Sequence, residues 1–287
     1  MVKQYTIGDA LQRGIALLKE NKTESALADA RVLLCHVLSC DKIYISVHKD
    51  DILDEECVRA YFELIDRRVK REPVSYILGK KEFMSLEFKV GEGILTPRPD
   101  TEILAELVIE KLKNISSPRI TDMCTGSGAI AVSLAKYIPS SRVIALDISD
   151  TAICTARENA RANGVDIYIA KHDVREPFLK KADAVVSNPP YIPTGDIKAL
   201  DDDVALYEPH LALDGGSDGL DFYRAIVDNI ESALKRDGLL AFEVGLGQAE
   251  DVCTIMSKKF YGIGTAKDLS GIDRVVYGYL ATPDRAQ

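Results

Sequence analysis

The sequence has 287 residues, of which 46% are hydrophobic and 28% charged, a composition typical of a soluble globular protein. No stretch approaches 18 uncharged apolar residues, so we expect no membrane span and no membrane partner. The net charge of −9 argues against broad binding to naked DNA, and we expect no direct nucleic-acid partner. Asp9 and Arg13 stand where a signal peptide would be apolar, which predicts a cytoplasmic location.

The six cysteines are scattered along the chain and form no CxxC pair. They are Cys35, Cys40, Cys57, Cys124, Cys154 and Cys253. Most of them lie inside apolar periodic segments, so we expect buried free thiols, no disulfide framework and no metal site.

The first 73 residues show helical spacing of apolar residues and no sustained strand alternation. Thr6, Ser25 and Asp54 can each cap a helix, because their side-chain oxygens can accept from free N–H groups of a first turn. This pattern predicts a helical N-terminal domain over residues 1–73.

Residues 74–95 change the pattern. Aromatic, aliphatic and charged residues alternate around Gly79, Gly91 and Gly93, which is typical of a hairpin. We therefore expect a hairpin linker over 74–95, followed by the segment TPRPDTE and a helix that begins near Asp100.

A basic run crosses the boundary between the helical segment and the linker, and it has two interpretations. It comprises Arg67, Arg68, Lys70, Arg71, Lys80 and Lys81. In the first interpretation the run is a solvated helix end, because cations interact favourably with the carboxyl end of a helix dipole. A contact surface for an acidic protein partner is the other, and the sequence does not decide between them.

From Arg119 onward, apolar strand segments alternate with helical segments. The predicted strands cover 119–124, 142–147, 166–173, 182–188 and 239–245, and two more flank a turn at Gly271. The predicted helices cover 128–138, 148–164 and 218–238, and a fourth starts at 247. Such alternation predicts an α/β fold, a Rossmann-like parallel sheet covered by helices with an antiparallel edge strand, over residues 96–287.

A glycine-containing loop follows the first predicted strand of this sheet. It reads Asp122, Met123, Cys124, Thr125, Gly126, Ser127 and Gly128. Glycines at a strand-to-helix turn let a ligand approach the backbone, and open α/β sheets bind ligands at this edge. The second strand ends in Asp147, 19 positions after Gly128, where a carboxylate can accept from ribose hydroxyls. A nicotinamide dinucleotide site would use the same device, and Asp147 could alternatively serve as the N-cap of the next helix.

The loop chemistry favours S-adenosylmethionine over a dinucleotide. The third glycine of a dinucleotide fingerprint is missing, because no glycine follows Gly128 until Gly164. Asp122 would repel a pyrophosphate but suits the ammonium of a methionine moiety. Asp173 ends the third strand, where it can accept from an adenine amino group, and Val174 can pack on the ring.

The fourth strand ends in the tetrapeptide Asn188-Pro189-Pro190-Tyr191. The prolines stiffen the backbone and remove donors, which leaves the Asn188 side-chain oxygen and the Pro189 carbonyl as acceptors. Tyr191 offers a face for stacking a planar group. Two acceptors on a conjugated NH2 localise its lone pair and make the nitrogen a methyl acceptor, so positioning and electrostatics would carry the reaction. A proline-rich turn without catalytic function is the alternative.

The chain resembles the release-factor glutamine methyltransferases, the HemK or PrmC family, over nearly its whole length. The segments that carry the resemblance are DARVLL, RRVKREPVSYILGKKEF, LTPRPDTE, DMCTGSGAIA, SNPPYI, YEPHLALDGGSDGL and KDLSGIDRVV. The combination of TPRPDTE with NPPY is specific to this family, whereas NPPY alone is shared with adenine-N6 DNA methyltransferases. The resemblance implies a helical N-terminal substrate-docking domain, a hairpin linker and a methyltransferase domain.

The resemblance also implies a reaction and its residues. The substrate would be the side-chain amide nitrogen (N5) of the glutamine in the Gly-Gly-Gln motif of class I peptide-chain release factors, with a role in translation termination. Asn188, Pro189, Pro190 and Tyr191 would bind that glutamine, and Arg98 would organise the site. Asp122, Cys124, Thr125, Gly126, Ser127, Gly128, Asp147, Asp173, Val174 and Asn188 would surround S-adenosyl-L-methionine.

Two positions depart from the family pattern. The family has glycine where this chain has Cys124, whose side chain should face away from the cofactor or narrow the pocket. An aromatic residue often stands at the position of Val174, so stacking on the adenine should be weaker here.

Three other functions are weaker alternatives. An adenine-N6 nucleic-acid methyltransferase shares NPPY but normally has a basic target-recognition region, and this chain is acidic. A nicotinamide-dependent oxidoreductase would need the third glycine. A non-catalytic binding protein would not need an intact tetrapeptide at Asn188. The sequence does not determine the oligomeric state, and we expect a monomer.

Overall fold

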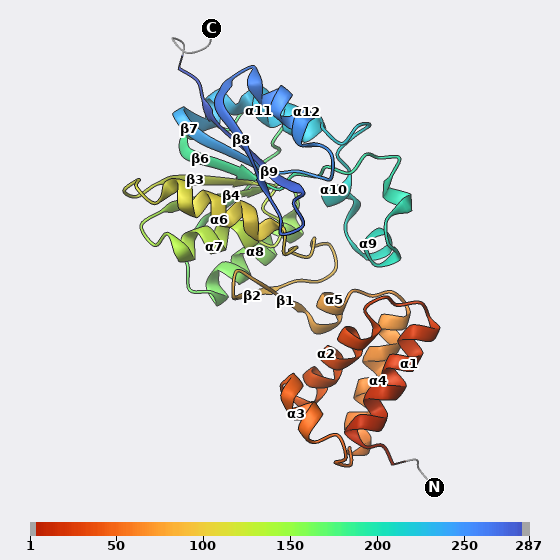
Figure 1. Ribbon diagram of the computed structural model, residues 1–287. Coiled ribbons are helices and arrows are strands. Elements are labelled where there is room, and N and C mark those ends of the chain that lie inside the picture. Colours follow the sequence, from red (N-terminus) through yellow and green to blue (C-terminus); the bar gives the residue numbers. More distant parts are fainter. Residues whose placement is uncertain (1–3, 283–287) are drawn as a thin grey trace. The chain divides into compact units, whose positions relative to one another are not determined.

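The computed structural model describes residues 4–282, which divide into two compact units (Figure 1). The first runs to Gly79 and also includes Asp201–Tyr207, and the second comprises Lys80–Leu200 and the chain from Glu208 onward. The chain therefore changes unit after Gly79, between the limits 73 and 95 expected for the linker.

The first unit is helical. Its helices are α1 (Ile7–Glu20), α2 (Ala26–Leu38), α3 (Lys42–Val47), α4 (Glu55–Val69), α5 (Val74–Leu78) and α9 (Asp202–Tyr207). Thr6 forms a capping box with Asp9, and Asp54 accepts from the backbone N–H of Cys57 at 2.7 Å. Ser25 does not cap α2, because its hydroxyl donates to Asp29 Oδ2 at 2.7 Å. The sequence pattern missed the short helix α3.

The three arginines of the basic run are paired within this unit. Arg68 is buried and donates from Nε to Asp29 Oδ2 at 2.7 Å, and its Nη2 lies 3.5 Å from Asp203 of α9. Arg67 pairs with Glu72 at 2.5 Å. These contacts bring α9, a segment distant in sequence, onto the end of α4. Neither interpretation of the run included a buried arginine that links two segments distant in sequence, here α2 and α9.

The segment 74–95 is not a hairpin throughout. Val74–Leu78 forms helix α5, which ends because Gly79 takes the left-handed conformation at φ 71°. The antiparallel pair β1 (Lys80–Phe83) and β2 (Leu86–Lys89) follows. Phe83 and Phe88 are fully buried and pack edge to face at 6.0 Å in the core of the second unit. The hairpin is therefore part of that unit.

Seven strands form the sheet of the second unit. They are β3 (Arg119–Met123), β4 (Arg142–Asp147), β5 (Tyr168–Lys171), β6 (Ala182–Ser187), β7 (Leu234–Glu243), β8 (Phe260–Lys267) and β9 (Asp273–Leu280). Their order is β5-β4-β3-β6-β7-β9-β8, and β9 runs antiparallel to both of its neighbours. The expected Rossmann-like sheet with a reversed strand at one end is confirmed, with β8 lying outside β9.

One predicted helix end was wrong. The helix expected over 218–238 is α11 (Asp221–Ala233), and β7 already begins at Leu234. Leu234 is fully buried and pairs with Ala182 in the sheet. The helix therefore ends before Leu234 and does not continue to Gly238 as the sequence pattern predicted. The left-handed conformation of Asp237 then redirects the chain.

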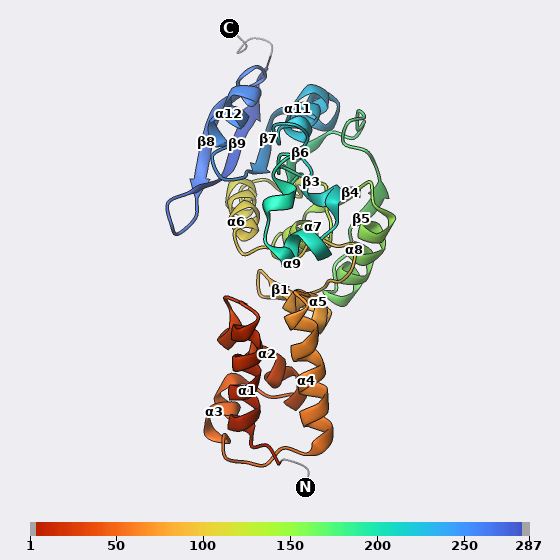
Figure 2. The same ribbon diagram turned by 90° about the vertical axis from the view of Figure 1, so that its right-hand side faces the viewer.

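Helices cover both faces of the sheet (Figures 1 and 2). One face carries α6 (Thr101–Leu112), α7 (Ala129–Tyr137) and α8 (Asp150–Ala162), and the other carries α11 and α12 (Ala249–Ser257). Short turns η1 (Ile197–Ala199) and α10 (His210–Leu213) follow β6. Along β6, Ala184 and Val186 enter one core and Val185 the other, because successive side chains point to opposite faces.

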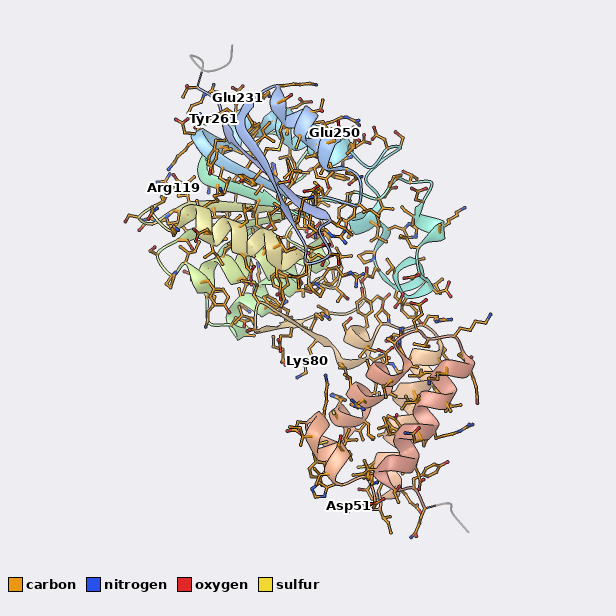
Figure 3. The ribbon with its side chains drawn as sticks, in the orientation of Figure 1. Asp51, Lys80, Arg119, Glu231, Glu250 and Tyr261 are labelled. Carbon is orange, nitrogen blue, oxygen red and sulfur yellow. The ribbon has the colours of Figure 1, made fainter. Side chains whose placement is uncertain are left out.

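Figure 3 labels Arg119 at the amino end of β3; the polar residues singled out from the sequence lie at the opposite ends of the parallel strands. Between residues 4 and 282, no helix is long and apolar enough to cross a membrane. All six cysteines are free, but none is fully buried, and Cys154 is exposed. The expectation of buried thiols is wrong for Cys154, and the other five cysteines are partly buried at the margins of the apolar cores.

Candidate active site

A cavity of about 780 Å³, including its open mouth, lies at the carboxyl ends of β3 to β6. Seven of the predicted site residues line it: Cys124, Gly126, Asp147, Asp173, Val174, Asn188 and Pro190. Asp122, Thr125, Ser127, Gly128, Pro189, Tyr191 and Arg98 are not among the residues that line it. The site thus has a wall and a supporting layer behind it.

The two loop glycines have different surroundings. Gly126 lines the cavity at φ 56°, and a Cβ placed there would meet no atom within 4 Å. Its backbone is therefore open to a ligand. Gly128 takes φ 82°, and a Cβ there would lie 3.0 Å from the Ala156 side chain. Gly128 therefore lets α7 approach α8 closely.

Asp122 belongs to the supporting layer. Its side chain is fully buried, and Oδ2 accepts from the Thr125 hydroxyl at 2.6 Å. Burial raises the pKa of Asp122 to about 7, against the lowering effect of the Thr125 hydrogen bond. Asp122 therefore supports the loop from its buried side. Its side chain is not exposed to the cavity and cannot contact a ligand there.

Asp147 connects the loop to the next helix while lining the cavity. Its Oδ2 accepts from the Gly126 N–H at 2.8 Å and its Oδ1 from the Ser149 N–H at 2.9 Å. Ser149 itself caps α8, so Asp147 is not the N-cap residue. Burial raises the pKa of Asp147, and the backbone hydrogen bonds from Ser149 and Gly126 oppose this shift.

Asp173 has a different environment at the same edge. Arg175 donates to both of its carboxylate oxygens, with Nη2 2.6 Å from Oδ2. This hydrogen bond lowers the pKa of Asp173, which keeps the carboxylate ionised. Val174 beside it is buried and lines the cavity as an aliphatic surface.

Cys124 lines the cavity and has a left-handed backbone at φ 62°. That conformation costs little for glycine and more for other residues, which gives a physical reason for the glycine in the family pattern. Burial raises the pKa of the Cys124 thiol, so the group is a neutral part of the wall.

Asn188 leaves β6 with its side chain at the cavity. Its Nδ2 donates to the Thr101 hydroxyl, with 3.3 Å between Nδ2 and Oγ1. The preceding Ser187 donates to the Met123 carbonyl at 2.6 Å and so joins β6 to the start of the glycine loop. The amide of Asn188 and the loop are thereby placed on one wall.

The backbone after Asn188 is fixed by a second set of contacts. Gln248 donates from Nε2 to the Tyr191 carbonyl at 2.8 Å and accepts from the Gly245 N–H at 3.0 Å. A Cβ at Gly219 would lie 2.3 Å from the Tyr191 carbonyl oxygen, so only glycine fits there. Burial raises the pKa of Tyr191 to about 12, which leaves its hydroxyl protonated near neutral pH.

Arg98 is tied to a buried carboxylate. Its Nη2 lies 2.7 Å from Glu208 Oε2, and the Glu208 side chain is only 1% exposed. Glu208 precedes Pro209, Leu211 and Ala212, which line the cavity. Arg98 therefore acts on the cavity through Glu208 in this geometry.

Several residues that line the cavity carried no recognisable signal of their role in the sequence. They are Gly93, Ile94, Leu95, Ile148, Ser149, Ala152, His172, Arg175, Pro209, Leu211, Ala212 and Phe222. Leu95 lies in the segment LTPRPDTE, and Pro209, Leu211 and Ala212 lie in YEPHLALDGGSDGL. Both segments carry the family resemblance, but the resemblance assigned no role to these four residues.

Comparison with known proteins identifies the family of the chain. A family model for a PrmC N-terminal domain matches residues 9–79, and one for a methyltransferase small domain matches residues 99–203. The release factor glutamine methyltransferase of Clostridium acetobutylicum is 42% identical over 276 residues, which cover 94% of this chain and 97% of that protein. The chain belongs to the release factor glutamine methyltransferase family. The Geobacter sulfurreducens member is 41% identical over 276 residues, with 96% of each chain covered.

Solved structures support the fold of the second unit. A T. thermophilus 16S rRNA methyltransferase, solved with AdoMet and guanosine, superimposes with a TM-score of 0.51 at 18% identity, covering 70% of this chain and 49% of that one. A methyltransferase from Pyrococcus furiosus gives a TM-score of 0.50 at 13% identity over 70% of this chain and 92% of that one. At this identity the likeness shows the fold alone.

Proposed function

We propose that this member of the family transfers a methyl group from S-adenosylmethionine to the side-chain amide nitrogen (N5) of the glutamine in the Gly-Gly-Gln motif of class I peptide-chain release factors. The observation that carries the proposal is the position of Asn188. Its amide stands on the wall of the same cavity that Asp147 and the glycine loop line. Methyl acceptor and methyl donor can therefore meet at one place.

The residues present fit the cofactor. The open backbone at Gly126 leaves room for a ligand against the loop, and the Asp147 carboxylate lines the cavity as an acceptor for ribose hydroxyls. Ile148, Val174 and Phe222 give the apolar surface that an adenine ring needs. When bound, S-adenosylmethionine supplies a methyl group activated by a positively charged sulfur.

The chain's own residues position the amide. The Asn188 Oδ1 and the Pro189 carbonyl would accept the two hydrogens of the glutamine NH2, which favours a pyramidal nitrogen with a localised lone pair. Burial keeps Tyr191 and Cys124 protonated near pH 7, so neither serves as a general base. The methyl–sulfur bond breaks as the methyl–nitrogen bond forms, and the alkylated nitrogen, now acidic, releases one proton to water. Orientation supplies most of the rate.

Mass spectrometry tests the proposal directly. The purified protein is incubated with S-adenosylmethionine and a class I release factor, and digestion should show one added methyl group on the Gly-Gly-Gln glutamine. Parallel reactions with adenine-containing DNA test the alternative substrate. Methylation of DNA without methylation of the factor would reject the proposal. We further propose that the protein acts as a monomer, which light scattering in solution tests.

The first unit is proposed to dock the release factor. Large apolar side chains are exposed on and after α3, where Ile43 and Val47 are 71% and 70% exposed and Ile52 is 65% exposed. Exposed apolar groups close in sequence are a feature of protein contact surfaces. The variant Ile43→Ser/Val47→Ser should raise KM for the whole factor severalfold and leave kcat on a short Gly-Gly-Gln peptide unchanged. Leu179→Ser, at a residue 82% exposed in the second unit, is the matched control.

A further inference from the structure

Glu243 is a buried carboxyl group at the end of β7 that the mechanism above does not use. Ser187 pairs with Phe242 in the β6–β7 ladder, so Asn188 and Glu243 leave adjacent strands side by side. Glu243 is 3% exposed, and among the described residues its Oε2 has no hydrogen-bond partner. Tyr223 donates to the Glu243 carbonyl at 2.9 Å and fixes this end of the strand.

Thr101 lies between Asn188 and this carboxyl group. It is the first residue of α6, is 4% exposed, and accepts from Asn188 Nδ2. Hydrogen bonding by Thr101 and Asn188 lowers the pKa of the Glu243 carboxyl group, which places both side chains next to it. The three side chains come from three elements, α6, β6 and β7, and form one buried polar cluster beside the cavity.

The hydrogen-bond directions in this cluster are dictated by chemistry. An ionised carboxylate only accepts, and a hydroxyl has one hydrogen. Thr101 must therefore donate to Glu243, which leaves its oxygen to accept from the NH2 group of Asn188. With the NH2 group used inward, the Asn188 Oδ1 is left for the substrate. The reverse amide orientation would present a donor to the glutamine NH2, which is itself a donor.

We propose that Glu243, acting on Asn188 both directly and through Thr101, is a positioning residue that fixes the orientation of the Asn188 amide so that Oδ1 faces the methyl acceptor. The inference rests on the proposed function of Asn188. Glu243 is not among the residues that line the cavity, so it acts without touching substrate or cofactor. Its contribution is to stabilise the orientation in which the Asn188 NH2 group and the Thr101 hydroxyl both donate inward, toward the carboxyl group.

The charge state of Glu243 controls this arrangement. Burial raises its pKa to about 7, hydrogen bonds from Thr101 and Asn188 oppose the shift, Asp100 adds to it and Arg274 opposes it. Tyr191 and Tyr223 are the other titratable groups that interact with it, and burial keeps both protonated. A protonated Glu243 could donate to Thr101, which would permit the reverse order. The cluster therefore favours the acceptor orientation when Glu243 is ionised, and kcat should rise with pH through about 7.

The test is a double-variant cycle with Asn188→Ala, measured under single turnover with labelled S-adenosylmethionine. Thr101→Val and Glu243→Gln should each lower the rate at least tenfold in the wild-type background, with cofactor Kd and release-factor KM within twofold. In the Asn188→Ala background, each should change the rate less than twofold, because there is no amide left to orient. Thr101→Ser keeps the hydroxyl and should retain most of the rate.

Control measurements separate orientation from structure. Thr121→Val makes the same change at another buried threonine, in β3, and should alter the rate less than twofold. Glu243→Gln should also remove the rise of kcat through pH 7. Equal rate losses in both backgrounds, or a wild-type pH profile in Glu243→Gln, would overturn the inference. If Glu243→Gln does not fold, Thr101→Val decides by the same cycle. A wild-type protein inactive on release factor would instead overturn the proposed function.

Discussion

The two halves of the sheet's carboxyl edge hold their polar groups in different ways. At β4 and β5, Asp147 and Asp173 line the cavity while their oxygens accept from backbone N–H groups or from Arg175. At β6 and β7, Asn188 reaches the cavity and Glu243 stays buried behind it. A carboxylate is an acceptor in any orientation, so it needs only to be held in place. An amide has an acceptor end and a donor end, so it also needs a neighbour that sets which end faces out.

The largest expected effect is at Asn188. Asn188→Ala should lower kcat by roughly a hundredfold or more, because one preorganised acceptor is lost in the transition state. Cofactor affinity should fall less than the rate. Steady-state kinetics on release factor, together with calorimetry of cofactor binding, measure both quantities.

Asn188→Asp sharpens that result. Asp keeps an acceptor whichever way it turns, so it should retain more activity than Ala and should not depend on Thr101 for orientation. An alanine variant with normal kcat would mean that the tetrapeptide only shapes the turn. A rate for Asp below that for Ala would show that the added charge, and not the acceptor, dominates.

On the cofactor half, Asp147→Ala should weaken S-adenosylmethionine binding by about 1.5 to 3 kcal/mol, because charge-assisted hydrogen bonds are lost. The structure adds a second cause, since Asp147 also holds the Gly126 N–H in the loop. Asp147→Asn keeps an oxygen for that bond and should lose less affinity. Calorimetry showing wild-type affinity for the alanine variant would remove Asp147 from the site.

Stability should depend on pH through Asp122. Its pKa is raised to about 7 in the folded protein from 3.8, so between these values the folded state binds a proton that the unfolded state has released. Stability therefore falls as pH rises from about 4 to about 7, by a few kcal/mol. Glu243 acts with the same sign. Asp122→Asn should flatten this fall in chemical denaturation at pH 5.5 and pH 8, and an unchanged slope would contradict the assignment.

The smallest effect is expected at Arg175, whose side chain is 63% exposed. Arg175→Ala removes the partner that lowers the pKa of Asp173, but the carboxylate should still be ionised at pH 7. The exposed ion pair contributes at most about 1 kcal/mol. Cofactor Kd should rise no more than about fivefold. A loss as large as that of Asp147→Ala would mean that Arg175 contacts the cofactor itself.

Local patterns determined much of this protein from the sequence alone. Apolar periodicity predicted most helices and strands of the second unit and their alternation along the chain. It does so because the spacing of apolar residues depends on whether one or two faces of an element are buried. The glycine loop and the tetrapeptide at Asn188 were found for a similar reason. Glycine and proline restrict the backbone where they stand, whatever surrounds them.

Only the tertiary structure decided which polar groups meet. Thr101 and Glu243 are 142 positions apart in sequence, and Arg98 and Glu208 are 110 apart. Arg68, which the sequence placed in a solvated or docking run, is buried against Asp29. Asp122, expected beside the ligand, lies behind the loop with Thr125. A charged or polar side chain carries no periodic signal of its partner, because the pairing depends on how distant segments pack.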